Sequence, residues 1–268
     1  MEKDEEFEYL KKKVSKILEF DCRNYSNTFL ARRIDSRLRA NSLKTYKEYV
    51  EFLDKSPEEH KKLDKELTIH VTDFFRDKAM WDVFIKSVIP KLIEEKGSNK
   101  RIRVWSAGCS TGEEPYSIAI CFHEVLQDKI SDYNIKIIGT DYDSETIKKA
   151  KQGVYPDSKL KDLDDKFIDD YFEKKSDGYH ILPKIKSMVD LQKGDIFSPI
   201  KPRNNDIIFC RNTVIYFEKD AKTNLYLDFH DNLNKGGFFI MGKTEILLGE
   251  SRNMFKVFDG AERIFVKI

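Results

Sequence analysis

Paired cysteines, long apolar runs and early glycines are all missing from this sequence. Its four cysteines form no CxxC pair and its five histidines are dispersed, which argues against a zinc site. No disulfide framework is expected either, and each cysteine is expected to be a small buried residue. No run of about eighteen apolar residues is present, as a membrane span requires. The start, MEKDEEFEYLKKK, lacks the apolar core of a signal peptide, so we predict a cytoplasmic protein without membrane insertion.

An excess of charge of one sign is also missing. Charged residues make up 35% of the 268 residues, yet the formal net charge at pH 7 is only +1. This balance argues against a protein whose whole surface binds nucleic acid or membrane, and we expect no nucleic-acid partner. With 40% hydrophobic residues, the chain can bury a core in one large domain or in two modest ones.

Residues 1–75 are predicted to form an all-helical N-terminal domain, because no glycine precedes Gly97 and the first proline is Pro57. Within it, residues 30, 34 and 38 form one apolar helix stripe. The other faces of this helix carry arginines at four positions: Arg32, Arg33, Arg37 and Arg39. Two interpretations stay open, an ordinary solvated helix face or a docking surface for an acidic macromolecule.

Residues 76–98 are predicted to be a connecting helix, and residues 99–268 an α/β domain. In the second part strands alternate with helices, which predicts a parallel sheet covered by helices on both faces. The four expected core strands are RIRVWSAG, NIKIIGTDYD, NDIIFCRN and GGFFIMGKTE. The C-terminal residues NMFKVFDGAERIFVKI predict a hairpin at the edge of the sheet. Residues from about 165 to 192, in which PKIK is assigned to a strand, predict a small antiparallel insertion.

Chemistry is expected at the carboxyl ends of the strands, where ligands bind in open parallel sheets. The first strand runs into the small residues AGCSTG at 107–112, which let a ligand approach the backbone, and then into Glu113 and Glu114. These carboxylates occupy a helix start that otherwise favours phosphate. Asp141 ends the second strand, where an acid suits ribose hydroxyls. Together these features predict an adenosine ligand without phosphate, a description that S-adenosylmethionine fits.

Residues 108–117, GCSTGEEPYS, closely resemble the signature of the chemotaxis receptor methyltransferases, the CheR family. Three more blocks agree with that family in position along the chain: TDFFRD, FCRNTVIYF and GGFFIMGKTE. FLARRIDSRLRA is similar to its arginine-bearing N-terminal helix, so the resemblance covers essentially the whole chain. It implies a class I (Rossmann-like) methyltransferase sheet. The implied activity is methyl transfer from S-adenosylmethionine to glutamate side chains on the cytoplasmic helices of a chemoreceptor, leaving S-adenosylhomocysteine.

The resemblance also implies roles for single residues. Glu114, together with Glu113, would face donor groups of the cofactor, and Asp141 would hold its ribose. Further implied cofactor contacts are Gly108 in the small-residue turn, Thr72 and Arg76 from the N-terminal side, Asp195 and Ile196 near the adenine, and Arg211 and Asn212 beside the methionine. These roles would place the site between two domains, with Tyr216 closing the catalytic end.

Three departures from the family pattern stand out. His70, also an implied cofactor contact, occupies a position that is commonly Asn, and Asp195 stands where Asn is often found. The segment after Phe172 is slightly shorter than in relatives that grip the receptor's C-terminal tail. We therefore expect direct recognition of the methylation region without a C-terminal pentapeptide tether, and, by the resemblance, a monomer.

Carboxylate methylation explains why no catalytic histidine is evident. A glutamate side chain has a pKa near 4.3, so it is ionised at neutral pH and needs no general base. Arg76 is predicted to orient the incoming carboxylate, whereas Tyr216 either lines the path of the methyl group or hydrogen-bonds that carboxylate. Two alternatives stay open: a binding module that senses S-adenosylmethionine, and a methyltransferase for another acidic protein or a small carboxylic acid. The arginine-rich helix speaks against a small substrate.

Overall fold

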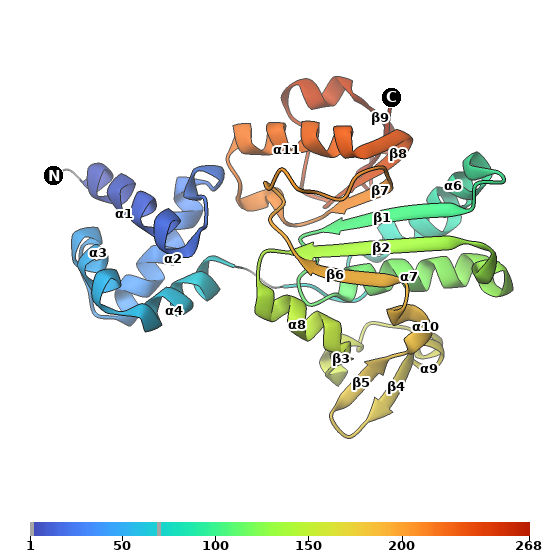
Figure 1. Ribbon diagram of the computed structural model, residues 1–268, viewed down its shortest axis with the longest axis horizontal. Coiled ribbons are helices and arrows are strands. Elements are labelled where there is room, and N and C mark those ends of the chain that lie inside the picture. The colour runs from blue at the N-terminus through green and yellow to red at the C-terminus, as the bar shows by residue number, and fades with distance from the viewer. Residues whose placement is uncertain (1–2, 69–70) are drawn as a thin grey trace. The chain divides into compact units, whose positions relative to one another are not determined.

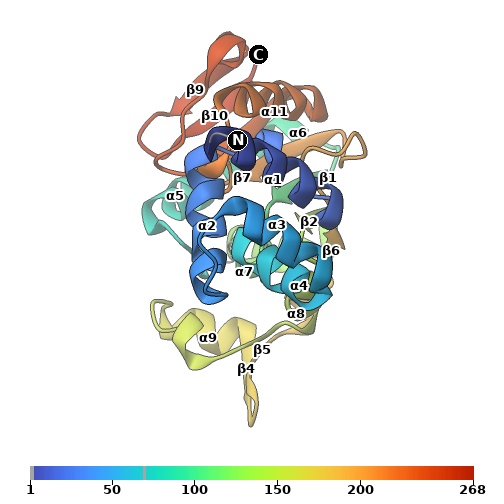
Figure 2. The same ribbon diagram turned by 90° about the vertical axis from the view of Figure 1, so that its left-hand side faces the viewer.

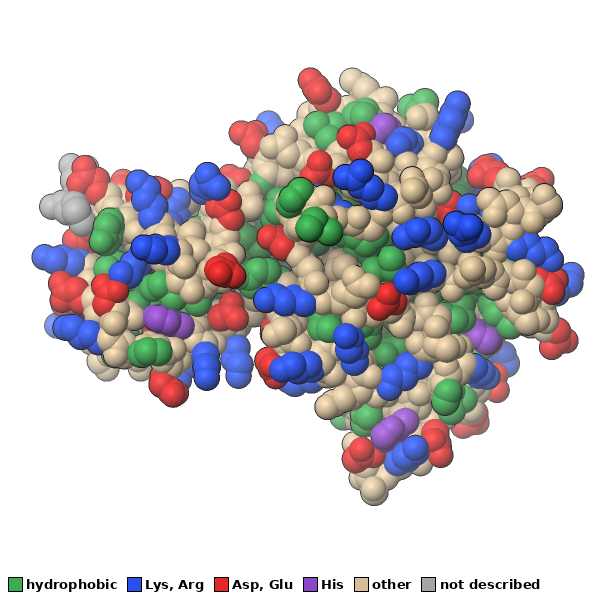
Figure 3. Space-filling view, in the orientation of Figure 1, with side chains coloured by type: hydrophobic (Ala, Val, Ile, Leu, Met, Phe, Trp, Pro, Cys, Tyr) green, Lys and Arg blue, Asp and Glu red, His purple; other side chains and the backbone are tan. Residues whose placement is uncertain are grey.

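The computed structural model describes residues 3–68 and 71–268, which divide into two compact units (Figure 1). The helical unit comprises residues 1–69 and 216–222. The sheet unit comprises residues 70–215 and 223–268. Within the described residues, no helix is both long and apolar enough to cross a bilayer. All four cysteines are buried and unpaired with one another, as predicted. Acidic and basic side chains are interspersed over the face drawn in Figure 3.

Within residues 3–68, the helical unit contains the helices α1 (Lys3–Leu18), α2 (Asn27–Ala40), α3 (Tyr46–Lys55) and α4 (Pro57–Leu67), with a short 3-10 turn at Cys22–Asn24. Helix α1 packs on α3, and α2 packs on α4 (Figure 2). Their apolar stripes meet in a core in which Leu10, Leu30 and Leu53 have no exposed surface. Ser26 caps α2 by accepting the N–H of Phe29, which fixes where the arginine-bearing helix begins.

The predicted helical reach to residue 75 is wrong. Helix α4 ends at Leu67, and residues 71–77, named here the linker segment, form turns and bends. Phe75 and Asp77 have positive φ angles of 51° and 62°, which a right-handed helix excludes. Tertiary contacts of the segment, described below, outweigh its local preference. Helix geometry returns at Lys78 and continues through α5 (Lys78–Val83), a π-helical turn (Phe84–Val88) and α6 (Ile89–Lys96).

The sheet unit contains a seven-stranded sheet in the order β6-β2-β1-β7-β8-β10-β9. Its strands are β1 (Arg101–Ala107), β2 (Asn134–Asp141), β6 (Val189–Lys193), β7 (Asn205–Cys210), β8 (Leu233–Met241), β9 (Phe255–Asp259) and β10 (Ile264–Lys267). The first five strands in this order are parallel, and β10 runs antiparallel to β8 and β9. The four predicted core strands and the C-terminal edge hairpin are therefore confirmed.

Helices cover both faces of this sheet, as predicted. Trp81 and Phe84 of the α5–α6 run and Phe122 of α7 (Glu113–Leu126) pack in the same buried cluster as Val104 and Phe209. On the opposite face, Phe229 of α11 (Lys219–Asn232) lies edge-on to Trp105, with ring centroids 5.3 Å apart. Short 3-10 turns lie at Gln127–Asp132, Val214–Tyr216 and Gly249–Asn253.

The small antiparallel sheet differs from the prediction in its members. It has the order β3-β5-β4, with β3 (Val154–Tyr155), β4 (Phe172–Lys175) and β5 (Gly178–Ile181), and it begins before residue 165. PKIK is the helix α10 (Pro183–Lys186), because proline suits a first helical turn. Strand β6, assigned to the insertion, pairs parallel with β2 in the large sheet. Between β2 and β6 the chain also forms α8 (Ser144–Gln152), a 3-10 turn at Asp157–Lys159 and α9 (Asp165–Tyr171).

Candidate active site

The strand order reverses at β1, since β2 and β7 flank it on opposite sides. Residues 108–112, the glycine turn, lead from β1 into α7 at this switch point. The N–H groups of Gly108 and Cys109 both donate to the carbonyl oxygen of Thr140 on β2, at 2.8 and 2.9 Å. Gly108 has a φ of 81°, and a Cβ added there would lie 2.5 Å from Oγ1 of Thr213. The turn is thus locked between β2 and the loop after β7.

We predict that Gly108→Ala weakens binding of an adenosine ligand at least about tenfold, because the strained φ and the contact with Thr213 both displace the turn. Adding Thr213→Ala should recover part of the loss by removing the contact but not the strain. Calorimetric titration with S-adenosylhomocysteine measures both variants. Full affinity in Gly108→Ala would mean that the turn has no part in binding.

Asp141, at the end of β2, binds one amide group of the glycine turn. Its Oδ2 accepts the N–H of Ser110 at 2.8 Å, and its Oδ1 accepts the N–H of Asp143 at 3.1 Å. The residue is 9% exposed. Since the N–H of Ser110 is bound by this carboxylate and those of Gly108 and Cys109 by the Thr140 carbonyl oxygen, the turn is poorly suited to bind phosphate. It presents acceptors, which suits hydroxyl and amino donors.

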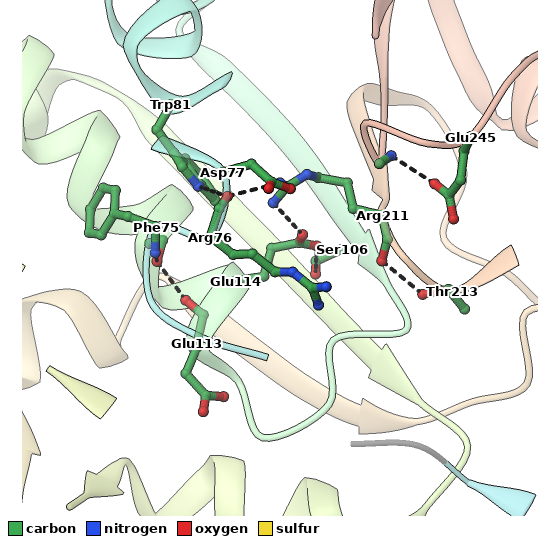
Figure 4. A network of polar contacts seen from close by, with 12 residues as sticks. Phe75, Arg76, Asp77, Trp81, Ser106, Glu113, Glu114, Arg211, Thr213 and Glu245 are labelled. Atoms are coloured by element: carbon green, nitrogen blue, oxygen red, sulfur yellow. Dashed lines mark hydrogen bonds and ion pairs between the residues drawn. The ribbon is translucent and has the colours of Figure 1, made fainter. Parts of the chain in front are cut away.

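Glu113 and Glu114 point away from one another (Figure 4). Glu114 Oε1 accepts the hydroxyl of Ser106 at 2.8 Å, and Oε2 lies 3.4 Å from Nη1 of Arg211. Burial raises the pKa of Glu114, and Arg211 opposes that rise. Glu113 is 0% exposed, with Oε2 bound to Thr111 at 2.6 Å. Its carboxylate is enclosed by the protein, and the implied contact of Glu113 with the cofactor stays a prediction.

Arg211, which follows β7, ties the linker segment to the sheet. Its Nη2 donates to Asp77 Oδ2 at 2.7 Å and to the carbonyl oxygen of Arg76 at 2.8 Å. The guanidinium carbon lies 5.6 Å from the ring centroid of Trp81, whose indole N–H donates to the same Arg76 carbonyl. The Arg211 side chain is 3% exposed. Arg211 is thus an internal clamp between the segment and Glu114.

Arg76 keeps most of its guanidinium uncommitted. Among the described residues its side chain makes one hydrogen bond, from Nη1 to the carbonyl oxygen of Val71 at 2.9 Å. The residue is half-buried, and its charge helps to lower the pKa of Glu114 against the effect of burial. Figure 4 shows the guanidinium lying toward Ser106 and Glu114 at the end of β1. A cation with unused donors is therefore available beside the strand ends.

Left-handed backbone gathers in the loops of this site. Phe75, Asp77, Ser110 and Asn212 all have positive φ without being glycine. Such backbone costs free energy and concentrates at functional sites. No sequence pattern predicts a positive φ at Phe75. At Ser110 and Asn212 the residue type is at least compatible with a turn, because serine and asparagine side chains hydrogen-bond to the local backbone.

Glu245 is a buried residue that sequence reasoning missed. Its Oε2 accepts the N–H of Gly242 at 2.7 Å, and backbone N–H groups of Asn212 and Val214 also face it. Burial raises the pKa of Glu245, and these N–H groups oppose that rise. The residue braces the loop after β7 that carries Asn212. Its one sequence signal was its place at the end of the block GGFFIMGKTE.

The loop after β6 lies beside Asp141, since the N–H of Gly194 donates to the Asp141 carbonyl oxygen at 2.9 Å. Asp195 in this loop is exposed and accepts the N–H of Phe197 at 2.9 Å, while Ile196 is 7% exposed. The loop therefore offers one polar and one apolar side chain next to the acid of β2.

Three predicted residues remain: Thr72, Tyr216 and His70. Thr72 is half-buried in the linker segment, and its carbonyl oxygen accepts a hydrogen bond from Lys159. Tyr216 belongs to the helical unit, where its carbonyl oxygen accepts the N–H of Ser26 at 2.9 Å and its ring lies 4.8 Å from that of Phe29. His70 lies outside the described residues.

The four arginines of α2 fall into two groups. Arg32 and Arg39 are exposed. Arg33 lies 3.4 Å from Glu66, with both side chains about a quarter exposed. Arg37 instead forms a two-bond pair with Glu59, at 2.8 Å each, and Glu59 is 2% exposed and also accepts the hydroxyl of Tyr49. The guanidinium of Arg37 is therefore part of the fold of the helical unit, and its docking role stays a prediction.

We predict that Arg37→Ala lowers the free energy of unfolding of the helical unit by about 3 kcal/mol at pH 7, since Glu59 is left charged and buried. Burial alone raises the pKa of Glu59, but bonds from Arg37 and Tyr49 outweigh it and the net pKa lies below 4.5. A lowered pKa stabilises the fold above pH 4.5, and this contribution is lost as the pH falls through the folded value.

The difference in free energy of unfolding between Arg37→Ala and the unchanged protein should therefore become smaller as the pH falls. Urea unfolding followed by circular dichroism from pH 7 to pH 3 measures it, with Arg39→Ala as the matched surface control. A pH-independent difference, or an equal loss in Arg39→Ala, would count against the buried pair.

Comparison with known proteins decides the family. The model described as "CheR methyltransferase, all-alpha domain" matches residues 5–68, and "CheR methyltransferase, SAM binding domain" matches residues 70–264. This chain belongs to the CheR methyltransferase family. A "Chemotaxis protein methyltransferase" of Listeria innocua is 33% identical over 248 residues, covering 92% of each chain. One of Borreliella burgdorferi is 32% identical over 225 residues, covering 81% of this chain and 79% of its own.

The CheR chain is an S-adenosylmethionine-dependent methyltransferase of chemotaxis. Its residues at the strand ends fit that cofactor. The turn amide of Ser110 is bound by Asp141 and those of Gly108 and Cys109 by the Thr140 carbonyl oxygen, so acceptor groups line the end of β2. Ser110 Oγ is buried and has no hydrogen-bond partner among the described residues, which leaves one more polar atom at the glycine turn for a ligand.

Proposed function

We propose that this CheR-family chain methylates glutamate side chains on the cytoplasmic helices of a chemoreceptor. The observation that carries the proposal is the half-buried Arg76, whose guanidinium lies among acceptor groups at the strand ends and makes one hydrogen bond to the residues that the structure describes. Such a group can form a charge-assisted hydrogen bond with an incoming carboxylate, whereas a neutral substrate would form no ion pair with it. The Listeria and Borreliella relatives are named chemotaxis protein methyltransferases, and these names support a chemotaxis protein as the substrate.

The cofactor would be held by groups at the ends of four strands, β1, β2, β6 and β7, and by the linker segment. Asp141 would accept the ribose hydroxyls and Glu114 the amino donors, while Asp195 and Ile196 would border the adenine. Asn212 and Thr72 would complete the contacts. Arg211 would support these residues by binding Asp77 of the linker segment and Glu114, which holds both in place. When bound, S-adenosylmethionine supplies a methyl group on a positively charged sulfur.

Arg76 would then bind one oxygen of the substrate carboxylate and leave a lone pair of the other directed at the methyl group. Its planar fork fixes this orientation better than a flexible ammonium does. The substrate glutamate is ionised at neutral pH, so no residue of the chain has to remove a proton. Tyr216 is proposed as the second catalytic residue, lining the path of the methyl group or donating to the carboxylate.

Methyl transfer to protein carboxylates gives base-labile esters, which identifies the product directly. The protein is incubated with methyl-labelled S-adenosylmethionine and a receptor cytoplasmic fragment, and the fragment is then treated with mild base. We expect label on the fragment that base releases as methanol, and none without receptor. Label on another acidic protein or a small acid, with none on receptor fragments, would replace the proposed substrate. Base-stable label would exclude carboxylate methylation.

Direct recognition of the methylation region predicts that a free receptor-tail peptide does not bind. The short hairpin of β4 and β5 turns at Ser176 and Asp177, which leaves little length for gripping an added strand. Fluorescence anisotropy of a labelled C-terminal pentapeptide should stay flat to high micromolar protein. Saturable binding in the micromolar range would overturn this part of the proposal.

Exposed arginines on α2 are proposed as the receptor-docking surface. Arg32 and Arg39 are exposed and Arg33 is partly exposed, so their charges can meet acidic side chains of a receptor helix. This contact would raise the association rate and would weaken with salt.

A further inference from the structure

The linker segment is attached to the rest of the sheet unit at three points. At its far end, Arg211 binds Asp77 and the carbonyl oxygen of Arg76. In its middle, the N–H of Phe75 donates to Ser117 Oγ at 3.1 Å, and that hydroxyl donates to the carbonyl oxygen of Glu113. At its near end, the attachment is made by Lys159, a residue that neither the motifs nor the proposed chemistry has used.

Lys159 reaches two parts of the site with one ammonium group. Its Nζ donates to the carbonyl oxygen of Thr72 and lies 3.2 Å from Oδ1 of Asp73. The same Nζ lies 3.3 Å from Oε1 of Glu113, at the start of α7. The Lys159 side chain is 28% exposed, whereas that of Glu113 is 0% exposed. One cation therefore joins the linker segment to a fully buried carboxylate beside the glycine turn.

Electrostatics makes this contact important for the position of the segment. Burial raises the pKa of Glu113, and Thr111 and Lys159 oppose that rise. A buried carboxylate needs a cation or several donors to remain charged. Lys159 supplies that charge only while it lies between Glu113 and Thr72, so the pair holds the near end of the segment in one place.

We propose that Lys159 is a positioning residue that sets the place of Thr72 and Arg76 at the cofactor site. It comes from the 3-10 turn Asp157–Lys159, which leads away from the small sheet, and so couples that part of the unit to the cofactor. The inference rests on the proposed contacts of Thr72 and Arg76 with cofactor and substrate.

Apolar packing keeps the segment folded when the ammonium group is removed. The ring of Phe74 lies edge-on to those of Tyr155 and Phe172, at 4.8 and 5.1 Å, and Phe75 stacks on Phe167 at 5.2 Å. Lys159→Met keeps the length of the side chain and removes its charge and donors. This variant should therefore fold, with the near end of the segment less well placed.

The experiment compares Lys159→Met with Lys159→Arg and with Lys161→Met, an exposed lysine two positions along the chain. Titration calorimetry with S-adenosylhomocysteine measures affinity, and hydrogen exchange with mass spectrometry measures opening of residues 71–77. We expect Lys159→Met to bind about tenfold more weakly, on the scale of one charge-assisted hydrogen bond, and to exchange faster in that segment. Lys159→Arg should recover most of the affinity, and Lys161→Met should match the unchanged protein.

A double-mutant cycle tests the route of the effect. In a Glu113→Gln background, Lys159→Met should weaken binding by less than about threefold further, because the ion pair is already gone. Unchanged affinity in Lys159→Met, or a loss of affinity that Lys159→Arg does not rescue and that comes with faster hydrogen exchange throughout the sheet unit, would overturn the inference. Because these readouts use no receptor, failure of the glutamate-methylation proposal would show separately, as intact binding without labelled receptor.

Discussion

Arg76→Ala is expected to reduce methyl transfer to a receptor fragment by at least about a hundredfold while affinity for S-adenosylhomocysteine stays within a few-fold. The guanidinium makes one hydrogen bond among the described residues, so its removal disturbs little of the fold. Its proposed task is to align a substrate carboxylate, and misalignment of reacting groups costs rate rather than cofactor affinity. Initial rates with labelled cofactor and calorimetry on the same preparations measure the two quantities.

Two further variants serve as controls for this result. Lys78→Ala removes an exposed cation two positions along the chain and should leave the rate unchanged. Arg76→Lys keeps the charge but loses the planar fork, so we expect a partial loss. Transfer at the original rate in Arg76→Ala would remove the arginine from the catalytic scheme. A parallel loss of rate and affinity would make it a cofactor-binding residue only.

Arg211→Met is expected to have the second large effect, a loss of about 3 kcal/mol in the free energy of unfolding together with loss of cofactor binding. The side chain is 3% exposed, and its guanidinium donates hydrogen bonds to Glu114, to Asp77 and to the carbonyl oxygen of Arg76. Methionine fills similar volume but leaves those acceptors without their cation. Thermal unfolding and calorimetry with S-adenosylhomocysteine measure the change.

Unpaired charge, rather than lost volume, should cause most of that effect. Adding Asp77→Asn to Arg211→Met removes one of the two stranded carboxylates and should restore part of the stability, although not the binding. Arg203→Ala, an exposed arginine before β7, serves as the control and should resemble the unchanged protein. If the double variant is less stable than Arg211→Met, the buried-charge explanation fails.

The four core strands and their parallel arrangement were predictable because each core strand is an apolar run bounded by turn residues, and helices separate most of them. Strand β6 was misassigned for a physical reason. Its sequence, VDLQK, alternates as an edge strand does, and alternation does not name the pairing partner. The linker segment was misread because Phe75 and Asp77 take left-handed backbone that only the surrounding contacts enforce.

Within the site, the type of ligand was easier to predict than the direction of each side chain. The acids after β1 and β2 indicated a ligand rich in donors, which the family match confirms through its cofactor. Glu113 and Glu114 are adjacent in sequence, yet one carboxylate enters the core and the other lies at the strand end. Helical geometry turns neighbours about 100° apart, and which of them faces the ligand depends on packing that the sequence does not reveal.

Acids that occupy a phosphate-type turn are the central feature of this account. Calorimetric titration of S-adenosylhomocysteine into the unchanged protein and into Asp141→Asn tests it most directly, with Asp162→Asn as an exposed control. The account predicts one binding site in the unchanged protein and the control, and at least about tenfold weaker binding in Asp141→Asn at equal thermal stability. Equal affinity in all three proteins, or no heat with folded unchanged protein, would contradict it.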